Sequence, residues 1–150
     1  MYTQPKNTTD AKPVTLTTLA KMRKAGERIA CLTAYDASFA AMLDEAGVDV
    51  VLVGDSLGNV IQGHATTVPV TVDDIVYHSR NVARGLKRAF LIGDMPFLSF
   101  PTLDRALDNA ARIMQQGGAK MVKLEGSGAQ ADIVHHLTDN GVPEIGRAHV

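Results

Sequence analysis

The stretch VDVVLVGDS, Val48–Ser56, decides the fold class, because it begins as an apolar run and ends in polar residues. Strands of a parallel sheet are covered on both faces, so their sequences read as unbroken apolar runs. The run breaks at Gly54, and Asp55 and Ser56 follow directly. The stretch therefore predicts a buried strand with a carboxylate and a hydroxyl at its carboxyl end.

The same strand-then-helix pattern occurs before and after this stretch. Each apolar run ends in polar residues and is followed by a segment with helical spacing of its apolar residues. Four such units in series predict a parallel sheet, because parallel neighbours need a crossover between them. The predicted strands are residues 28–36, 48–56, 88–97 and 119–127, and the predicted helices are a short one from Thr15 and those at 37–47, 71–87, 102–118 and 128–141.

Two architectures accommodate this series, an open doubly wound sheet and a (β/α)8 barrel. A dinucleotide-binding doubly wound sheet needs a glycine-rich turn after its first strand, and TAYDASFA, residues 33–40, has no glycine. A barrel instead builds its site from polar residues at the carboxyl ends of several strands, which is the pattern found here. A complete barrel takes about 250 residues. We therefore expect a truncated barrel, with residues 15–143 forming about the first four β/α units.

Composition excludes several classes of protein. The 150 residues are 45% hydrophobic and 21% charged, with a net charge of −1, so there is no large basic field for nucleic acid or an anionic membrane. No apolar run reaches the ~18 residues of a membrane span. Residues 1–14 have little to bury and are predicted to be a disordered leader without targeting features. The single cysteine, Cys31, lies in an apolar run and is expected to be buried, and the chain to be cytoplasmic.

Acidic residues end three of the apolar runs. Asp55, Asp94 and Glu125 follow or close the second, third and fourth strands. Neighbouring strand ends lie ~5 Å apart, so these carboxylates should converge and need a counter-charge. An all-oxygen cluster favours Mg²⁺, which predicts a metal site at these three residues. Lys123 shares a strand face with Glu125. An anionic substrate would give the Lys123 ammonium a second negatively charged partner.

Each of these residues also has a structural interpretation. An aspartate after a strand commonly caps the next helix, and for Asp36 this is the favoured role. An acidic residue ends three separate apolar runs, and this repetition favours a metal site over helix capping. The histidines share no metal-ligand spacing, so we expect structural or solvated roles, with His78 on a helix surface. These four are His64, His78, His135 and His136, and the fifth histidine, His149, lies near the end of the chain.

Five motifs, in order and spacing, resemble the ketopantoate hydroxymethyltransferase family. The resemblance runs from about residue 15 to residue 143. One motif alone would be weak, but five in register are specific. They are TAYD at 33–36, VLVGDSLG at 51–58, IQGHATTVPVT at 61–71, GDMPF at 93–97 and MVKLEG at 121–126.

The resemblance implies a Mg²⁺-dependent barrel of the phosphoenolpyruvate mutase and isocitrate lyase type, assembled as a homodecamer in many bacteria. Its reaction moves a hydroxymethyl group from 5,10-methylenetetrahydrofolate to 3-methyl-2-oxobutanoate through a Mg-stabilised enolate. The product, 2-dehydropantoate, is a precursor of pantothenate and coenzyme A. By the same resemblance, Asp55 and Asp94 hold the metal, with Glu125 supporting it directly or through water. Asp55, Ser56, Asp94 and Lys123 would bind the oxo acid.

Two other functions remain open from the residues themselves. One is a related Mg²⁺-dependent C–C lyase of the same superfamily, which folate dependence would distinguish. The other is a non-catalytic fragment that binds a 2-oxo acid.

The chain departs from the family pattern at its end. After GVP, at 141–143, the family continues into a GHLGL-like segment and has a catalytic glutamate further on, whereas this chain reads EIGRAHV. His149 is not in the matching context, so no general base can be assigned and we expect this chain to be inactive. EIGRAHV is also the translation of a widely used sequencing-adapter string. Residues 144–150 are therefore predicted to be a non-native tail.

Overall fold

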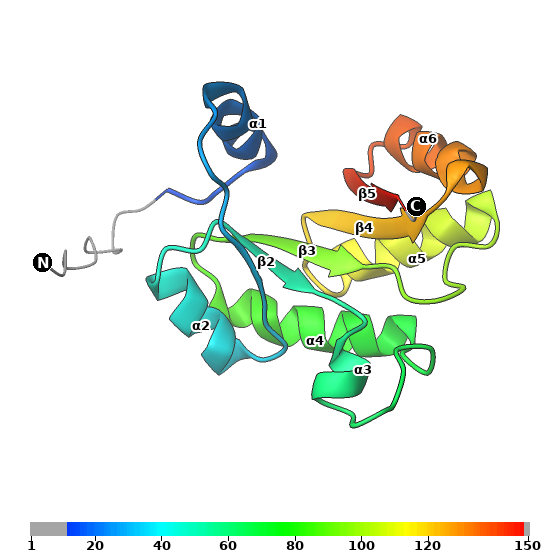
Figure 1. Ribbon diagram of the computed structural model, residues 1–150, viewed down its shortest axis with the longest axis horizontal. Coiled ribbons are helices and arrows are strands. Elements are labelled where there is room, and N and C mark those ends of the chain that lie inside the picture. Colours follow the sequence, from blue (N-terminus) through cyan, green and yellow to red (C-terminus); the bar gives the residue numbers. More distant parts are fainter. Residues whose placement is uncertain (1–11, 149–150) are drawn as a thin grey trace, which may run out of the picture.

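Five parallel strands form one sheet in the computed structural model, which describes residues 12–148 (Figure 1). Their order in the sheet follows the chain, and every neighbouring pair is parallel. A doubly wound sheet reverses its strand order at a switch point, so this sequential order is that of a barrel and confirms the predicted fold. The strands are β1 (Cys31–Thr33), β2 (Val50–Val53), β3 (Phe90–Asp94), β4 (Met121–Gly126) and β5 (Glu144–Ala148).

Side-chain caps start most of the long helices where the sequence predicts. Asp36 accepts a hydrogen bond from the Phe39 N–H at 2.8 Å, which confirms its predicted capping role. Thr71 and Asp74 form a reciprocal capping box. The helices are α1 (Leu16–Ala25), α2 (Ala37–Glu45), α3 (Leu57–Val60), α4 (Val72–Gly85), α5 (Leu103–Gln115) and α6 (Ala131–Asp139), with a 3₁₀ turn, η2, at Gly128–Gln130.

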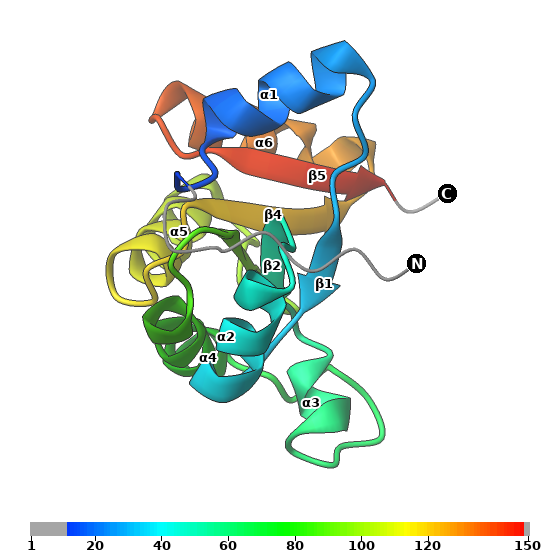
Figure 2. The ribbon, with the colours of Figure 1, turned by 90° about the vertical axis from the view of Figure 1, so that its left-hand side faces the viewer.

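The sheet is covered differently on its two faces. On one face, strand residues such as Val51 and Leu124 pack against buried residues of α4 and α5, among them Ile75 and Ile113. On the other face, a smaller cluster that includes Phe90 packs against the start of the chain. Figures 1 and 2 show α1 on the opposite side of the sheet from α4. The smaller cluster comprises Val14, Val50, Phe90, Ile92 and Met121, with Leu19 and Leu52 packed against it.

The structure corrects the expectation for Cys31 and adds an element after β2. Cys31 is exposed rather than buried, because β1 pairs only with β2 and lies at the sheet edge. The connection after β2, for which no helix or strand was predicted, contains the short helix α3. Most of the predicted leader lies outside the described residues. Its last residue, Val14, is buried, and its N–H donates to the Arg88 carbonyl at 2.8 Å.

The predicted non-native tail begins with β5. This strand pairs in parallel with β4, with Glu144 opposite Val122 and Ile145 opposite Lys123. The pairing gives these residues a place in the sheet but does not reveal their origin, so the adapter hypothesis stays a prediction. Within residues 12–148, no helix has the length and apolar character needed to cross a membrane.

Candidate active site

The candidate residues gather at the carboxyl ends of β2, β3 and β4. Asp94 is the last residue of β3, and its Cα pairs in register with that of Lys123 in β4. Glu125 lies two residues beyond Lys123 on the same strand face. Asp55 and Ser56 follow β2, between the strand and α3. The fold thus brings residues that are far apart in sequence to one end of the sheet.

The Lys123 ammonium lies between two carboxylates. Its Nζ is 2.6 Å from Asp94 Oδ1 and 2.9 Å from Glu125 Oε1. The side chains of Lys123 and Asp94 are only 14% and 7% exposed, so this contact is largely shielded from water. Shielded ion pairs of this kind interact more strongly than surface pairs. Two of the three carboxylates, Asp94 and Glu125, are therefore brought together, with Lys123 as their counter-charge.

These contacts shift the pKa values of both partners. Burial raises the pKa of Asp94, the nearby Asp55 charge adds to this, and the Lys123 ammonium offsets only part of it. Burial alone would lower the pKa of Lys123. Asp94 and Glu125 outweigh that effect, so the pKa of Lys123 is raised. The lysine is consequently held as a cation at the strand ends.

Asp55, Ser56 and Asp94 surround the backbone at Gly54. The Asp55 N–H donates to Asp94 Oδ2 at 3.4 Å. A Cβ atom on Gly54 would lie 3.4 Å from Ser56 Oγ and 3.6 Å from Asp94 Oδ2. The end of β2 therefore brings a hydroxyl and a carboxylate close to the same point, next to the Lys123 ion pair.

The donor set fits Mg²⁺ through two carboxylates rather than three. The backbone N–H of Asp55 donates to the Asp94 carboxylate, and the Asp55 side chain lies near enough for its charge to help raise the pKa of Asp94. The Lys123 ammonium bonds both Asp94 and Glu125. Across residues 12–148, no three acidic, histidine or cysteine side chains are grouped closely enough to hold a metal ion. Mg²⁺ usually takes one or two carboxylates and completes its shell with water or substrate oxygens. Asp55 and Asp94 meet that requirement.

Sequence reasoning missed Tyr35 and misplaced His78. The Tyr35 hydroxyl lies 2.6 Å from Ser56 Oγ. His78 is half-buried rather than on the helix surface, because its Nδ1 donates to the Tyr35 carbonyl oxygen at 2.7 Å. Tyr35 lies in the TAYD motif just after β1, at the same end of the sheet as Asp55 and Asp94. The place of Tyr35 directly after a predicted strand was the one signal in the sequence that could have indicated a role at the site.

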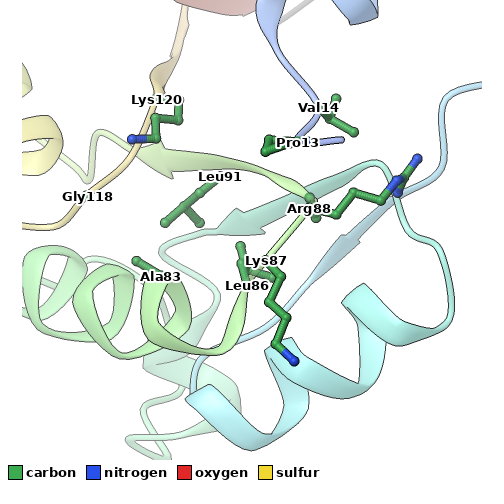
Figure 3. A pocket seen from close by; sticks show the side chains of 10 residues that line it. Pro13, Val14, Ala83, Leu86, Lys87, Arg88, Leu91, Gly118 and Lys120 are labelled. Atoms are coloured by element: carbon green, nitrogen blue, oxygen red, sulfur yellow. The ribbon is translucent and has the colours of Figure 1, made fainter. Parts of the chain in front are cut away.

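A cavity of about 340 Å³ lies at the other end of the sheet (Figure 3). Its lining comes from the segment before α1, the end of α4 and the residues that lead into β3 and β4. These are the amino ends of the strands, so the cavity is separate from the candidate site. The lining residues are Pro13, Val14, Ala83, Leu86, Lys87, Arg88, Ala89, Leu91, Gly118 and Lys120.

Sequence comparisons identify close relatives. The family model described as ketopantoate hydroxymethyltransferase matches residues 13–150. A 3-methyl-2-oxobutanoate hydroxymethyltransferase of Nitrosococcus oceani is 60% identical over 130 residues, which are 87% of this chain and 49% of that protein. The enzyme of the same name from Halorhodospira halophila is 53% identical over 133 residues, 89% of this chain and 48% of that protein. The chain thus spans about half the length of these curated relatives.

Solved structures share the fold at low sequence identity. A phosphonopyruvate hydrolase in complex with oxalate and Mg²⁺ aligns with a TM-score of 0.69 at 14% identity, covering 87% of this chain and 50% of that one. A 2,3-dimethylmalate lyase, described as a member of the PEP mutase/isocitrate lyase superfamily, aligns with a TM-score of 0.66 at 15% identity. It covers 88% of this chain and 52% of that one. The described strands therefore share the fold of about half of each of these two proteins.

Proposed function

The chain belongs to the ketopantoate hydroxymethyltransferase family, and we propose that the whole protein transfers a hydroxymethyl group to 3-methyl-2-oxobutanoate. The one-carbon donor is 5,10-methylenetetrahydrofolate and the product is 2-dehydropantoate. The observation that carries this proposal is the charge arrangement at the strand ends. Lys123 is held as a cation between Asp94 and Glu125, and Asp55 and Ser56 lie alongside. Such a site suits a small anionic substrate together with a divalent cation.

The chain's own residues bind and orient the oxo acid. The Lys123 ammonium places positive charge where the substrate's carboxylate and keto oxygens would lie, and the Ser56 hydroxyl donates a hydrogen bond to one of them. Asp55 and Asp94 would hold Mg²⁺. When bound, Mg²⁺ supplies Lewis acidity that stabilises negative charge on the substrate oxygens. The phosphonopyruvate hydrolase complex with oxalate and Mg²⁺ supports this pairing of a small acid with the metal.

The general base that removes the C3 proton is not assigned to any residue of this chain. The 150-residue chain is accordingly proposed to bind the oxo acid without turning it over. We also propose a cytoplasmic location, which a sequence with a single cysteine supports.

The assay is formation of 2-dehydropantoate by the whole protein from 3-methyl-2-oxobutanoate, methylenetetrahydrofolate and Mg²⁺. We expect product only when all three are present. Product formation by the 150-residue chain alone would contradict the assignment of the base outside it. Cleavage of a carbon–carbon bond in a related acid, without folate, would indicate a C–C lyase instead and overturn the transferase proposal.

A further inference from the structure

The Ser56 hydroxyl does not cap a helix, although its position would allow it. Ser56 is the residue before α3, where a serine side chain commonly accepts a backbone N–H. Here its backbone is already helical, with φ −56° and ψ −13°, and its hydroxyl makes no capping hydrogen bond. The hydroxyl instead lies 2.6 Å from Tyr35 Oη, 21 residues away in sequence. A tertiary contact, rather than the local helix, therefore determines where Ser56 Oγ points.

Tyr35 is held firmly enough to determine that direction. The residue is only 9% exposed, and a buried tyrosine hydroxyl requires a hydrogen-bond partner. A carbonyl oxygen can only accept, so His78 Nδ1 carries a proton and donates it to the Tyr35 carbonyl at 2.7 Å. The two rings also meet edge to face, with centroids 6.4 Å apart. Backbone and ring of Tyr35 are thus both fixed by α4.

We propose that Tyr35 is a positioning residue, whose hydroxyl orients the Ser56 hydroxyl toward the 2-oxo acid. This inference rests on the proposed function, because it assumes that an oxo acid occupies the site beside Asp94 and Lys123. Tyr35 itself need not touch the substrate.

The direction of the hydrogen bonds follows from the substrate's chemistry. The carboxylate and keto oxygens of an oxo acid can only accept, so Ser56 must donate to them. Its lone pairs are then available to Tyr35, which donates to Ser56 Oγ. In such a chain each hydrogen bond polarises the next, and the serine becomes a stronger donor to the anion. Without the tyrosine hydroxyl, the Ser56 side chain loses the contact that selects one rotamer.

The first test is a double-mutant cycle for binding of 3-methyl-2-oxobutanoate to this chain, measured by calorimetry with Mg²⁺ present. Tyr35→Phe should weaken binding by up to about tenfold, which is the range for loss of one hydrogen bond between uncharged groups. Tyr35→Phe added to Ser56→Ala should cause no further loss, because it acts only through Ser56. Tyr77→Phe is the matched control, since Tyr77 also contacts His78 edge to face but is 61% exposed. Equal losses from Tyr35→Phe in both backgrounds would overturn the inference.

The second test needs no substrate. The two Hα–Hβ couplings of Ser56, measured by NMR, report whether its side chain occupies one rotamer. We expect single-rotamer couplings in the wild type and in Tyr77→Phe, and averaged couplings in Tyr35→Phe. Unchanged couplings in Tyr35→Phe would refute the positioning role. If no form of the chain binds the oxo acid while the couplings change as expected, the proposal that this chain binds the oxo acid fails and the Tyr35–Ser56 relationship stands.

Discussion

Asp94 is the residue on which the electrostatics of the site depend. It is buried beside both a carboxylate and an ammonium, and its pKa is raised mainly by burial. A carboxyl whose pKa is higher in the folded state favours folding at acidic pH. That contribution is lost as the pH rises from 3.8 through the folded-state value. At neutral pH the ionised Asp94 therefore costs stability, and Lys123 limits that cost.

The pKa of Asp94 should respond to its neighbour Asp55. We expect the Asp94 carboxyl carbon to titrate above 3.8 in an NMR experiment, and Asp55→Asn to lower the midpoint by removing a like charge. Asp108→Asn, on the exposed face of α5, is the control and should leave the midpoint unchanged. A midpoint that does not move in Asp55→Asn would mean that the two carboxylates do not interact as the structure indicates.

The element that places Asp94 is β3, and its fit against α5 depends on Gly93. A Cβ atom at Gly93 would lie 2.4 Å from Ile113 Cγ2, which is far inside van der Waals contact. Asp94 is the next residue along the strand, so a displacement of Gly93 moves the site directly.

Gly93→Ala should therefore destabilise the protein and weaken oxo-acid binding together. Overpacking of this kind costs about 1–3 kcal/mol, which urea unfolding would measure. Gly128→Ala is the matched control, because a Cβ atom there meets nothing within 4 Å. Wild-type stability in Gly93→Ala would show that β3 and α5 are not packed as tightly as described.

Local patterns in the sequence predict most elements but not the contacts between them. Asp36, Thr71 and Thr102 cap the helices that the sequence places after them, because capping is decided within three residues. The charge convergence at Asp94 and Lys123 was also predictable, since parallel strands end at one edge. The exposure of Cys31 and the link from Tyr35 to Ser56 were not. Each depends on which elements are neighbours in space, and a local pattern carries no such information.

At the scale of the whole molecule, the sheet has two edge strands, β1 and β5, among the described residues. A closed barrel has none. Leu32 on β1 and Ile145 on β5 are 51% and 49% exposed. Unpaired strand edges with apolar side chains are sites at which chains associate.

The 150-residue chain should therefore associate in a concentration-dependent manner. Leu32→Lys should reduce this association, because a lysine on an edge strand disfavours pairing with another strand. Light scattering after size-exclusion chromatography would measure it. Val68→Lys is the control, since Val68 is 55% exposed but lies in the loop before α4. A monomeric wild type, or an equal effect of both lysines, would contradict the role of the β1 edge.

The central claim is that the ends of β2, β3 and β4 form a Mg²⁺-dependent oxo-acid site. The most direct measurement is exchange of the C3 proton of 3-methyl-2-oxobutanoate with D₂O, catalysed by the whole protein without folate and followed by NMR. We predict exchange that requires Mg²⁺ and falls by about a hundredfold or more in Asp55→Ala, while Asp108→Ala exchanges at the wild-type rate. Mg²⁺-dependent exchange that persists in Asp55→Ala would contradict the account.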